Sequence, residues 1–304
     1  MAMATAMATV PATAPRGAEV PKRALVLLLA LAAACAGGGD AGPAPLPETP
    51  PERVVVLGPS TAANLEALGL FDRVAAVSDW CAVPAAAGRP RVGGQLDPDL
   101  EAIAALGPDL LLTQGRIPVL EDWCRRNGIP LHAFKTQGWE DWEEEVFFLG
   151  RLFGRPGRAA DLVQEARAEL ALVSLEAVSP PRRALLVASR DPSAIRGLLV
   201  AGGGSFLQPL LEHAGGLNVF GDDPRDWFDL DEETLVRAAP EVILEFHPGG
   251  EVDEAALLAT WKDAFPELPA VRAGRVRALT GKDLLHPGPN MPHTAAVLAA
   301  ALRD

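Results

Sequence analysis

Hydrophobic and polar residues follow two different periods along most of this chain. Short apolar runs bounded by glycine, proline or charged residues predict buried strands at residues 53–59, 73–78, 109–114 and 130–134. The stretches between these runs place apolar residues three and four positions apart, which predicts helices with one buried face. Strand and helix therefore alternate, and we predict a small parallel sheet with helices on its faces.

Individual residues mark where these helices begin and end. Asp97 followed by Pro98 predicts the N-cap and the first position of the helix before the third strand. Gly69 and Gly128 follow helical stretches and are expected to end them, because glycine adopts the left-handed backbone conformation easily.

The middle of the chain, residues 139–179, has almost no strand pattern. One amphipathic helix is predicted over residues 139–154 and a second over residues 156–178. The second helix would be about 34 Å long, given the rise per residue of an α-helix. A helix of this length between two α/β halves predicts a strut that connects two lobes.

The second half of the chain returns to alternating strands and helices. We therefore predict an α/β fold of two Rossmann-like lobes with small parallel sheets, bridged by one long helix and separated by a ligand cleft. The predicted parts are residues 51–138 for the N-terminal lobe, 139–179 for the helical region and 180–304 for the C-terminal lobe. Further strands are predicted at residues 183–190, 241–246 and 275–280, and further helices at 205–216, 230–239, 255–265 and 291–302.

Residues 101–112, EAIAALGPDLLL, and residues 233–244, ETLVRAAPEVIL, are similar at a constant offset of 132 positions. In both segments a proline ends a helical stretch, and an acidic residue leads into a buried strand. Such similarity suggests two lobes that are built alike. Helix–proline–strand junctions are common in α/β proteins, so chance similarity is the alternative.

The N-terminus has the pattern of an export signal. Residues 24–34, ALVLLLALAAA, form an apolar run after several basic residues, and this run is too short to span a bilayer. We predict a signal peptide over residues 1–34, a lipidated Cys35 and a flexible linker over residues 35–50. The alternative is a plain signal peptide that is cleaved after an alanine. We expect an exported protein, anchored to the membrane by its lipid and facing the periplasm or the cell exterior.

Composition narrows the partners and the chemistry. The net charge of −13 argues against nucleic acid as a partner, because phosphate binding needs clustered lysine and arginine. The chain contains no tyrosine. Cys81 and Cys124 could form a disulfide in an exported protein, but their spacing does not decide this.

Five segments, in order, resemble the substrate-binding proteins of ABC importers for vitamin B12 and iron chelates, the helical-backbone periplasmic binding proteins. The resemblance covers about residues 52–304. It implies two lobes bridged by one long helix, no catalytic activity, and no resident cofactor or metal. It also implies a monomer that captures a small metal chelate and delivers it to a permease and ATPase complex. The segments are PERVVVLGPSTAANLEALGLFDRVAAVSDWCAVP, RVGGQLDPDLEAIAALGPDLLL, LGRLFGRPGRAADLV, FLQPLLEHAGGLNVF and LPAVRAGRVRALTGKDLLHPGP.

Candidate ligand contacts lie where the predicted strands end. In the family, the positions that match Trp80 and Trp227 are often aromatic, and flat rings suit a flat macrocycle. The segment GKDLLHPGP resembles a cleft loop of the family. All of these residues could instead be packed or solvated loop residues. The predicted ligand cleft consists of Trp80, Gln114, Arg116, Arg190, Trp227, His247, Asp283 and His286.

In this family, one surface glutamate on each lobe docks on arginines of the permease. By position these are Glu101 and Glu212, and Glu233, which aligns with Glu101 in the internal repeat, is the alternative. Charged contacts of this kind chiefly set orientation and association rate.

The ligand class is the most open part of the prediction. Anionic ferric siderophores usually need several cleft arginines, and only Arg116 and Arg190 are well placed. Haem would need a histidine as its iron ligand, because tyrosine is absent. Cobalamin is already fully ligated and needs mainly aromatic and polar contacts, which Trp80 and Trp227 suit best. We therefore favour a corrinoid, with haem or a ferric siderophore as the alternative.

Two function classes without transport stay open beside this one: a sensor lipoprotein and an enzyme similar to α/β hydrolases. An enzyme would need a nucleophile–base pair or a ligand cluster that converges at one site. The five histidines form no pair with the spacing of metal ligands, and no G-x-S-x-G or H-E-x-x-H motif is present. We therefore do not expect an enzyme.

Overall fold

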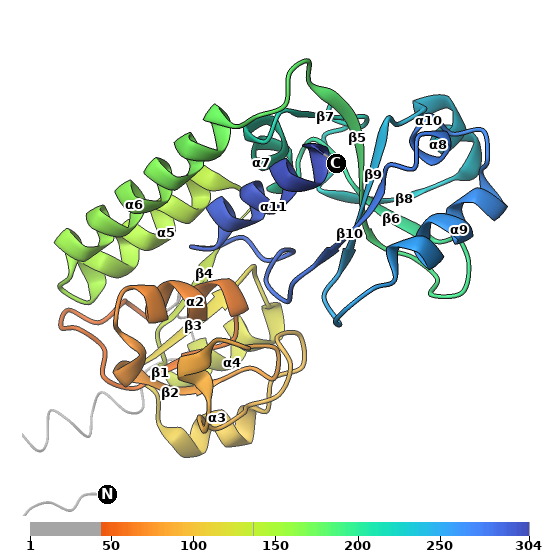
Figure 1. Ribbon diagram of the computed structural model, residues 1–304. Coiled ribbons are helices and arrows are strands. Elements are labelled where there is room, and N and C mark those ends of the chain that lie inside the picture. Colours follow the sequence, from red (N-terminus) through yellow and green to blue (C-terminus); the bar gives the residue numbers. More distant parts are fainter. Residues whose placement is uncertain (1–43, 136, 304) are drawn as a thin grey trace, which may run out of the picture. The chain divides into compact units, whose positions relative to one another are not determined.

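The computed structural model describes residues 44–135 and 137–303 (Figure 1). The predicted signal peptide and the predicted lipidation site, Cys35, lie outside the described residues. Among the residues that are described, no helix is both long enough and apolar enough to cross a bilayer.

The N-terminal lobe contains one parallel sheet, as predicted, in the strand order β2-β1-β3-β4. Residues of β1 alternate between two hydrophobic clusters, with Val54 and Val56 in one and Val55 in the other. Both faces of the sheet are therefore covered, which explains the continuous apolar runs. The elements of this lobe are β1 (Val54–Val56), α2 (Pro59–Ala67), β2 (Val74–Val77), α3 (Leu100–Leu106), β3 (Leu110–Gln114), α4 (Pro118–Asn127) and β4 (Leu131–Phe134).

The start of α3 differs from the prediction. Its N-cap is Asp99, whose carboxylate accepts hydrogen bonds from the backbone N–H groups of Glu101 (3.1 Å) and Ala102 (2.9 Å). Asp97 is therefore not the cap. Pro98 forms an isolated antiparallel bridge with Gly93, which keeps this part of the chain extended and delays the helix by two residues. The predicted ends of α2 and α4 are confirmed, because Gly69 and Gly128 have φ angles of 67° and 65°.

The long helix is confirmed as α6 (Pro156–Leu175), which follows α5 (Trp139–Leu152). It has 20 residues and ends before Val178, the predicted limit. Two consecutive prolines, Pro180 and Pro181, follow α6. The helix does not extend to them, because a residue that precedes a proline disfavours the helical conformation.

Helix α6 contacts both lobes. Near its start, the Arg158 guanidinium donates to the Ala67 carbonyl oxygen at the end of α2 (3.3 Å). Near its end, the Ser174 hydroxyl lies 2.7 Å from His213 Nδ1, at the end of α7 (Leu207–His213). It also packs against α5 and against α11 (Met291–Arg303), as Figure 1 shows.

The C-terminal lobe has a mixed sheet in the order β10-β9-β5-β6-β8, with β7 beside β5. A wholly parallel sheet was expected, but β6 is antiparallel to both β5 and β8. Only eight residues, 190–197, connect β5 to β6, and this is too short for the crossover that a parallel pair needs. The remaining elements are β5 (Arg182–Ser189), β6 (Leu198–Ala201), β7 (Gly216–Asn218), β8 (Trp227–Leu230), α8 (Glu232–Ala238), β9 (Val242–His247), α9 (Glu254–Ala264), α10 (Pro269–Arg272) and β10 (Val276–Thr280).

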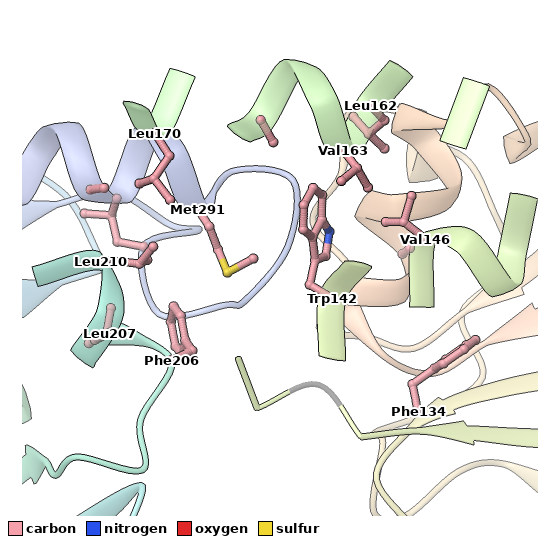
Figure 2. Packing of buried hydrophobic residues seen from close by; sticks show 14 of the residues in the cluster. Phe134, Trp142, Val146, Leu162, Val163, Leu170, Phe206, Leu207, Leu210 and Met291 are labelled. Carbon is pink, nitrogen blue, oxygen red and sulfur yellow. The ribbon is translucent and has the colours of Figure 1, made fainter. Parts of the chain in front are cut away.

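One hydrophobic cluster joins the two lobes (Figure 2). It includes Trp142 from α5, Leu170 from α6, Leu210 from α7 and Met291 from α11, all at most 6% exposed. The Trp142 indole N–H also donates to the Asn64 side-chain oxygen in α2 (2.8 Å). The two sheets are therefore attached to one shared helical layer, and the α/β class with two lobes and a long connecting helix is confirmed.

The internal sequence repeat corresponds to a helix–strand unit that occurs in both lobes. Asp99 caps α3 and Asp231 caps α8, and the two positions are 132 residues apart, like the repeat itself. Asp109 accepts the backbone N–H of Arg53 (3.0 Å) at the start of β1. Its counterpart Glu241 accepts the backbone N–H of Arg183 (2.9 Å) in β5. These two arginines also donate to the last carbonyl groups of the neighbouring helices, at Leu106 and Ala238.

Candidate ligand-binding site

A pocket of about 280 Å³, the cleft pocket, is lined by residues of both lobes. The N-terminal lobe contributes one side of α2, from its first to its last turn, and the loop after β2, and the C-terminal lobe contributes the loop between β10 and α11. Most of the lining is alanine, proline and other apolar side chains, as is usual for ligand sites. Its residues are Pro59, Ser60, Ala63, Glu66, Ala67, Trp80, Ala82, Val83, Pro84, Lys282, Asp283, His286, Pro287, Pro289 and Asn290.

Trp80 combines an exposed side chain with a fixed backbone. The residue is 71% exposed, whereas the next residue, Cys81, is 1% exposed. The Arg91 guanidinium donates to the carbonyl oxygens of Ser78 (2.8 Å) and Cys81 (2.7 Å) on either side of it. The Ser78 hydroxyl in turn donates to the Leu57 carbonyl oxygen (2.7 Å). A large aromatic surface is thus held open to solvent at the pocket, although apolar surface of this size is normally buried.

In the loop between β10 and α11, one amide side chain binds two backbone carbonyl groups. The Asn290 side-chain nitrogen donates to the carbonyl oxygens of Asp283 (2.6 Å) and His286 (3.3 Å). The side chains of Asp283 and His286 are exposed and line the cleft pocket together with Trp80. Three of the predicted cleft residues therefore come together here.

A second pocket of about 600 Å³, the C-lobe pocket, lies where β5 and β9 end and α9 begins. It contains two predicted cleft residues, Arg190 and His247, together with Glu245. It shares no lining residue with the cleft pocket. The predicted cleft residues are therefore distributed over two pockets.

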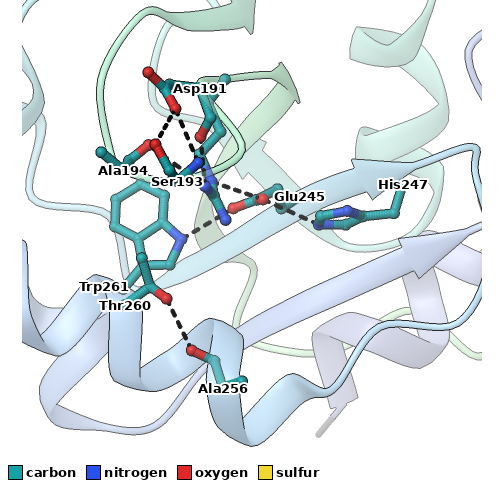
Figure 3. A network of polar contacts seen from close by, with 9 residues as sticks. Asp191, Ser193, Ala194, Glu245, His247, Ala256, Thr260 and Trp261 are labelled. Carbon is teal, nitrogen blue, oxygen red and sulfur yellow. Dashed lines mark hydrogen bonds and ion pairs between the residues drawn. The ribbon is translucent and has the colours of Figure 1, made fainter.

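The C-lobe pocket contains a buried ion pair (Figure 3). Arg190 Nε lies 2.8 Å from Glu245 Oε1, and these two side chains are 9% and 2% exposed. The Trp261 indole N–H donates to the other carboxylate oxygen (3.0 Å). His247 Nε2 lies 3.0 Å from Glu245 Oε1 but is not aligned for a hydrogen bond. The positive charge of Arg190 is thus already neutralised within the protein.

The other predicted cleft residues line neither pocket as the structure describes them. Arg116 is 80% exposed and forms a two-pronged ion pair with Glu121, with distances of 2.8 and 2.6 Å. The Gln114 carbonyl oxygen accepts a hydrogen bond from the Gln95 side chain. Trp227 is half-buried and packs against the cluster that joins the lobes.

The predicted docking glutamates are both on the surface. Glu101 lies in the first turn of α3, and Glu212 lies near the end of α7, where it accepts a hydrogen bond from Gln208 (2.7 Å). The alternative, Glu233, is also exposed and lies 3.8 Å from Arg237.

The two cysteines of the folded part do not pair. Cys81 and Cys124 are free and buried, in the loop after β2 and in α4. Burial raises the pKa of both thiols, that of Cys124 to about 12. Such thiols are poor nucleophiles and poor metal ligands at neutral pH.

Sequence reasoning missed several residues of the cleft pocket, notably Ser60, Lys282 and Asn290. Ser60 comes shortly after the first strand, in the position where ligands bind to parallel sheets. This position in the sequence could have identified it as a candidate. Lys282 is adjacent to the predicted Asp283. Within the described ranges, no three histidine, cysteine or carboxylate side chains are grouped as metal ligands.

Most of the chain is similar in sequence to known proteins. The model of the family described as periplasmic binding protein matches residues 54–282. A vitamin B12-binding protein of Vibrio parahaemolyticus is 27% identical over 79% of this chain and 85% of its own length. A cobalamin-binding protein of Halobacterium salinarum is 28% identical over 84% of this chain and 71% of its own length.

A solved structure is also similar to this chain in both fold and sequence. A periplasmic haem-binding protein from Pseudomonas aeruginosa superposes with a TM-score of 0.71 at 27% identity, and the match covers 83% of this chain and 92% of that protein.

Proposed function

This chain belongs to the periplasmic binding protein family, and we propose that it is the extracytoplasmic receptor of an ABC importer for a corrinoid such as cobalamin. In this role it binds the ligand outside the membrane and delivers it to a permease and ATPase complex, without altering it. Curated relatives named for vitamin B12 and cobalamin support this choice of ligand.

The single observation that carries the proposal is the exposed indole of Trp80 at the cleft pocket. Its 71% exposure on a fixed backbone provides a flat apolar surface, which suits the face or edge of a macrocycle. The pocket volume of about 280 Å³ is at the small end for ligand sites, so a corrinoid would project beyond it and remain partly exposed.

The charges argue against an anionic siderophore. Both arginines predicted for that ligand, Arg116 and Arg190, are already paired with carboxylates, at 2.6 and 2.8 Å. Recruiting either one would require breaking an ion pair. Haem is the second candidate, because His286 lines the cleft pocket and a solved haem-binding relative shares the fold.

Titration of the purified protein with cobalamin, haemin and an anionic ferric siderophore tests the ligand class. We expect saturable quenching of tryptophan fluorescence by cobalamin at the lowest concentration. Saturable binding of the siderophore alone would reject a corrinoid. Tight binding of haemin, with a visible spectrum that changes in His286→Ala, would select the second candidate.

We further propose that Glu101 and Glu212 dock on the permease. Their exposure on two different lobes fits a receptor that contacts its partner with both lobes. The double variant Glu101→Lys/Glu212→Lys should abolish ligand uptake in cells while ligand affinity in solution stays unchanged. Glu233→Lys, which changes the repeat-related glutamate, is the matched control. Loss of uptake in the control alone would assign the docking role to Glu233.

The proposed membrane anchor is a lipid on Cys35. The mature protein should appear in the membrane fraction, and Cys35→Ser should release it into the soluble fraction. A wild-type protein that is already soluble, with the mass of the unmodified chain, would support cleavage after an alanine instead.

A further inference from the structure

We propose that the carboxyl edge of the N-terminal sheet carries an apolar platform for the corrin macrocycle, which extends the binding surface beyond the cleft pocket. The platform consists of three exposed side chains, Trp80, Leu96 and Val119. This inference rests on the corrinoid function proposed above. It adds two ligand contacts, Leu96 and Val119, that line neither pocket.

The exposure of these side chains is unusual for this chain. Only eight large hydrophobic side chains are exposed in the ranges that the structure describes. Three of them, Trp80 (71%), Leu96 (80%) and Val119 (55%), lie in the segments that follow β2 and β3. Of the others, four are distributed over α6, β7 and α8, and one lies near residue 44. Single exposed apolar residues are normal, but a group of them at one place marks a binding surface.

Hydrogen bonds bring the first two segments of the platform to the same edge of the sheet. The backbone N–H of Asp79, the residue before the tryptophan, donates to the Gly93 carbonyl oxygen (2.9 Å). The side chain of Gln95, the residue before Leu96, donates to the Gln114 carbonyl oxygen at the end of β3. The segment that carries Leu96 therefore runs from the end of β2 to the end of β3.

Val119 lies at this edge because α4 begins directly beyond β3. Ile117 is 5% exposed and packs with residues of the sheet, α3 and α4, whereas Val119, two positions later, is exposed. In the order β2-β1-β3-β4, the ends of β2 and β3 are two strand spacings apart, about 10 Å. A corrin macrocycle with its substituents is wide enough to contact both strand ends.

The size of the ligand explains what covers the platform. The cleft pocket has a volume of about 280 Å³, so a corrinoid that contacts Trp80 projects beyond it. Trp80 belongs to both the pocket and the platform, which makes the two surfaces continuous. Ligands of parallel sheets bind beyond the carboxyl ends of the strands, where the platform lies. Burial of its apolar surface by the macrocycle would contribute to affinity.

The charges beside the platform favour a corrinoid over haem. Asp79 and Asp97 are exposed carboxylates next to Trp80 and Leu96. The nearby cation, Arg116, is paired with a glutamate at 2.6 Å. These carboxylates would repel the two anionic propionates of haem, whereas the amide side chains of a corrinoid carry no charge.

Calorimetric titration of the purified protein with cobalamin tests the platform. The double variant Leu96→Ser/Val119→Ser should bind cobalamin about tenfold more weakly, because the apolar surface that the ligand covers is lost. The matched control is Leu175→Ser/Val236→Ser. It changes a leucine that is 82% exposed on α6 and a valine that is 41% exposed on α8, and it should bind cobalamin like the wild type.

An apolar variant separates a contact from a structural effect. Leu96→Met/Val119→Ile keeps the apolar surface and should retain the wild-type affinity. Because all these side chains are exposed, the thermal unfolding midpoints of the variants should match that of the wild type. Unchanged cobalamin affinity in Leu96→Ser/Val119→Ser, while Trp80→Ala binds more weakly, would overturn the platform and leave the corrinoid function intact. An equal loss of affinity in the matched control would also overturn the platform. A wild-type protein that binds no corrinoid would overturn the function.

Methyl resonances report the contact directly. Saturating cobalamin should shift the methyl resonances of Leu96 and Val119 and leave those of Leu175 and Val236 unchanged. If cobalamin bound without shifting either platform residue, the macrocycle would lie elsewhere and the platform would be wrong.

Discussion

The two lobes contain the same helix–strand unit and differ where its strand ends. In both units an aspartate caps the helix, an acidic residue binds the start of the neighbouring strand, and an arginine binds the end of the helix. At the end of β3, Thr113 is buried and donates its hydroxyl hydrogen to the Gly115 carbonyl oxygen (3.0 Å). At the equivalent position of β9, Glu245 is buried against Arg190 (2.8 Å).

The comparison distinguishes the hydrogen bonds that build the fold from the side chains that can contact a ligand. The hydrogen bonds that build each lobe recur in the other lobe, whereas the charged group at the strand end occurs only in the second unit. The repeat therefore identifies the architecture but does not indicate which lobe carries which ligand contact. Variants that affect one unit and not the other test this separation.

The largest effect is expected from Arg190→Met. This change leaves the Glu245 carboxylate buried without its cation, which should cost about 3–5 kcal/mol of unfolding free energy, although Trp261 still donates to it. The matched control in the other lobe is Arg116→Met, which removes an exposed arginine and should leave the unfolding midpoint unchanged. Urea denaturation measures both. A loss below about 1 kcal/mol for Arg190→Met would contradict the importance of this pair.

Smaller effects on stability, of opposite sign in the two lobes, are expected at the ends of the repeated helices. Gly107 and Ala239 both end the repeated helix in the left-handed conformation, with φ angles of 55° and 44°. Gly107→Ala should destabilise the protein by about 1–2 kcal/mol, because a side chain is strained in this conformation. Ala239→Gly relieves the same strain but gains flexibility in the unfolded state, so it should stabilise by less than about 1 kcal/mol. Thermal unfolding measures both variants. If both shifted the unfolding midpoint in the same direction, the two helix ends would not be equivalent.

The smallest effect concerns a histidine of the N-terminal lobe. His132 in β4 stacks on Phe148 with a centroid distance of 4.1 Å, and burial lowers its pKa from 6.5. The unfolded state therefore takes up this proton first, and stability should decrease as the pH falls below about 6.5. His132→Phe should weaken this decrease between pH 7 and pH 5.5.

Urea midpoints at several pH values measure this slope, and His293→Gln, at an exposed position of α11, controls for the loss of a histidine. An unchanged slope in His132→Phe would show that other groups cause the acid sensitivity.

Much of the fold was predictable because its signals are local. Continuous apolar runs marked the strands covered on both faces, and glycines marked the ends of α2 and α4. Strands β6, β7 and β8 were missed because they lie among turns, outside the regular alternation of apolar runs and helices. The cap of α3 was misplaced because a bridge between Gly93 and Pro98, which local sequence does not reveal, holds the chain extended.

The site was less predictable because pairing is not local. Arg190 and Glu245 are 55 positions apart, and nothing in the sequence indicates that they neutralise each other. Likewise, Trp80 and Trp227 read alike as aromatic residues near strand ends, but only Trp80 is exposed at a pocket. Burial and partners, which depend on the whole fold, determine which candidate can bind a ligand.

The central claim is that the cleft pocket binds a corrinoid against Trp80, and calorimetric titration with cobalamin tests it most directly. The wild type, Trp80→Ala and Trp227→Phe would be compared under identical conditions. We predict that Trp80→Ala weakens binding at least tenfold, the cost of losing about 1.4 kcal/mol of aromatic contact, while Trp227→Phe binds like the wild type. Unchanged cobalamin affinity in Trp80→Ala, or no cobalamin binding by the wild type, would contradict the account.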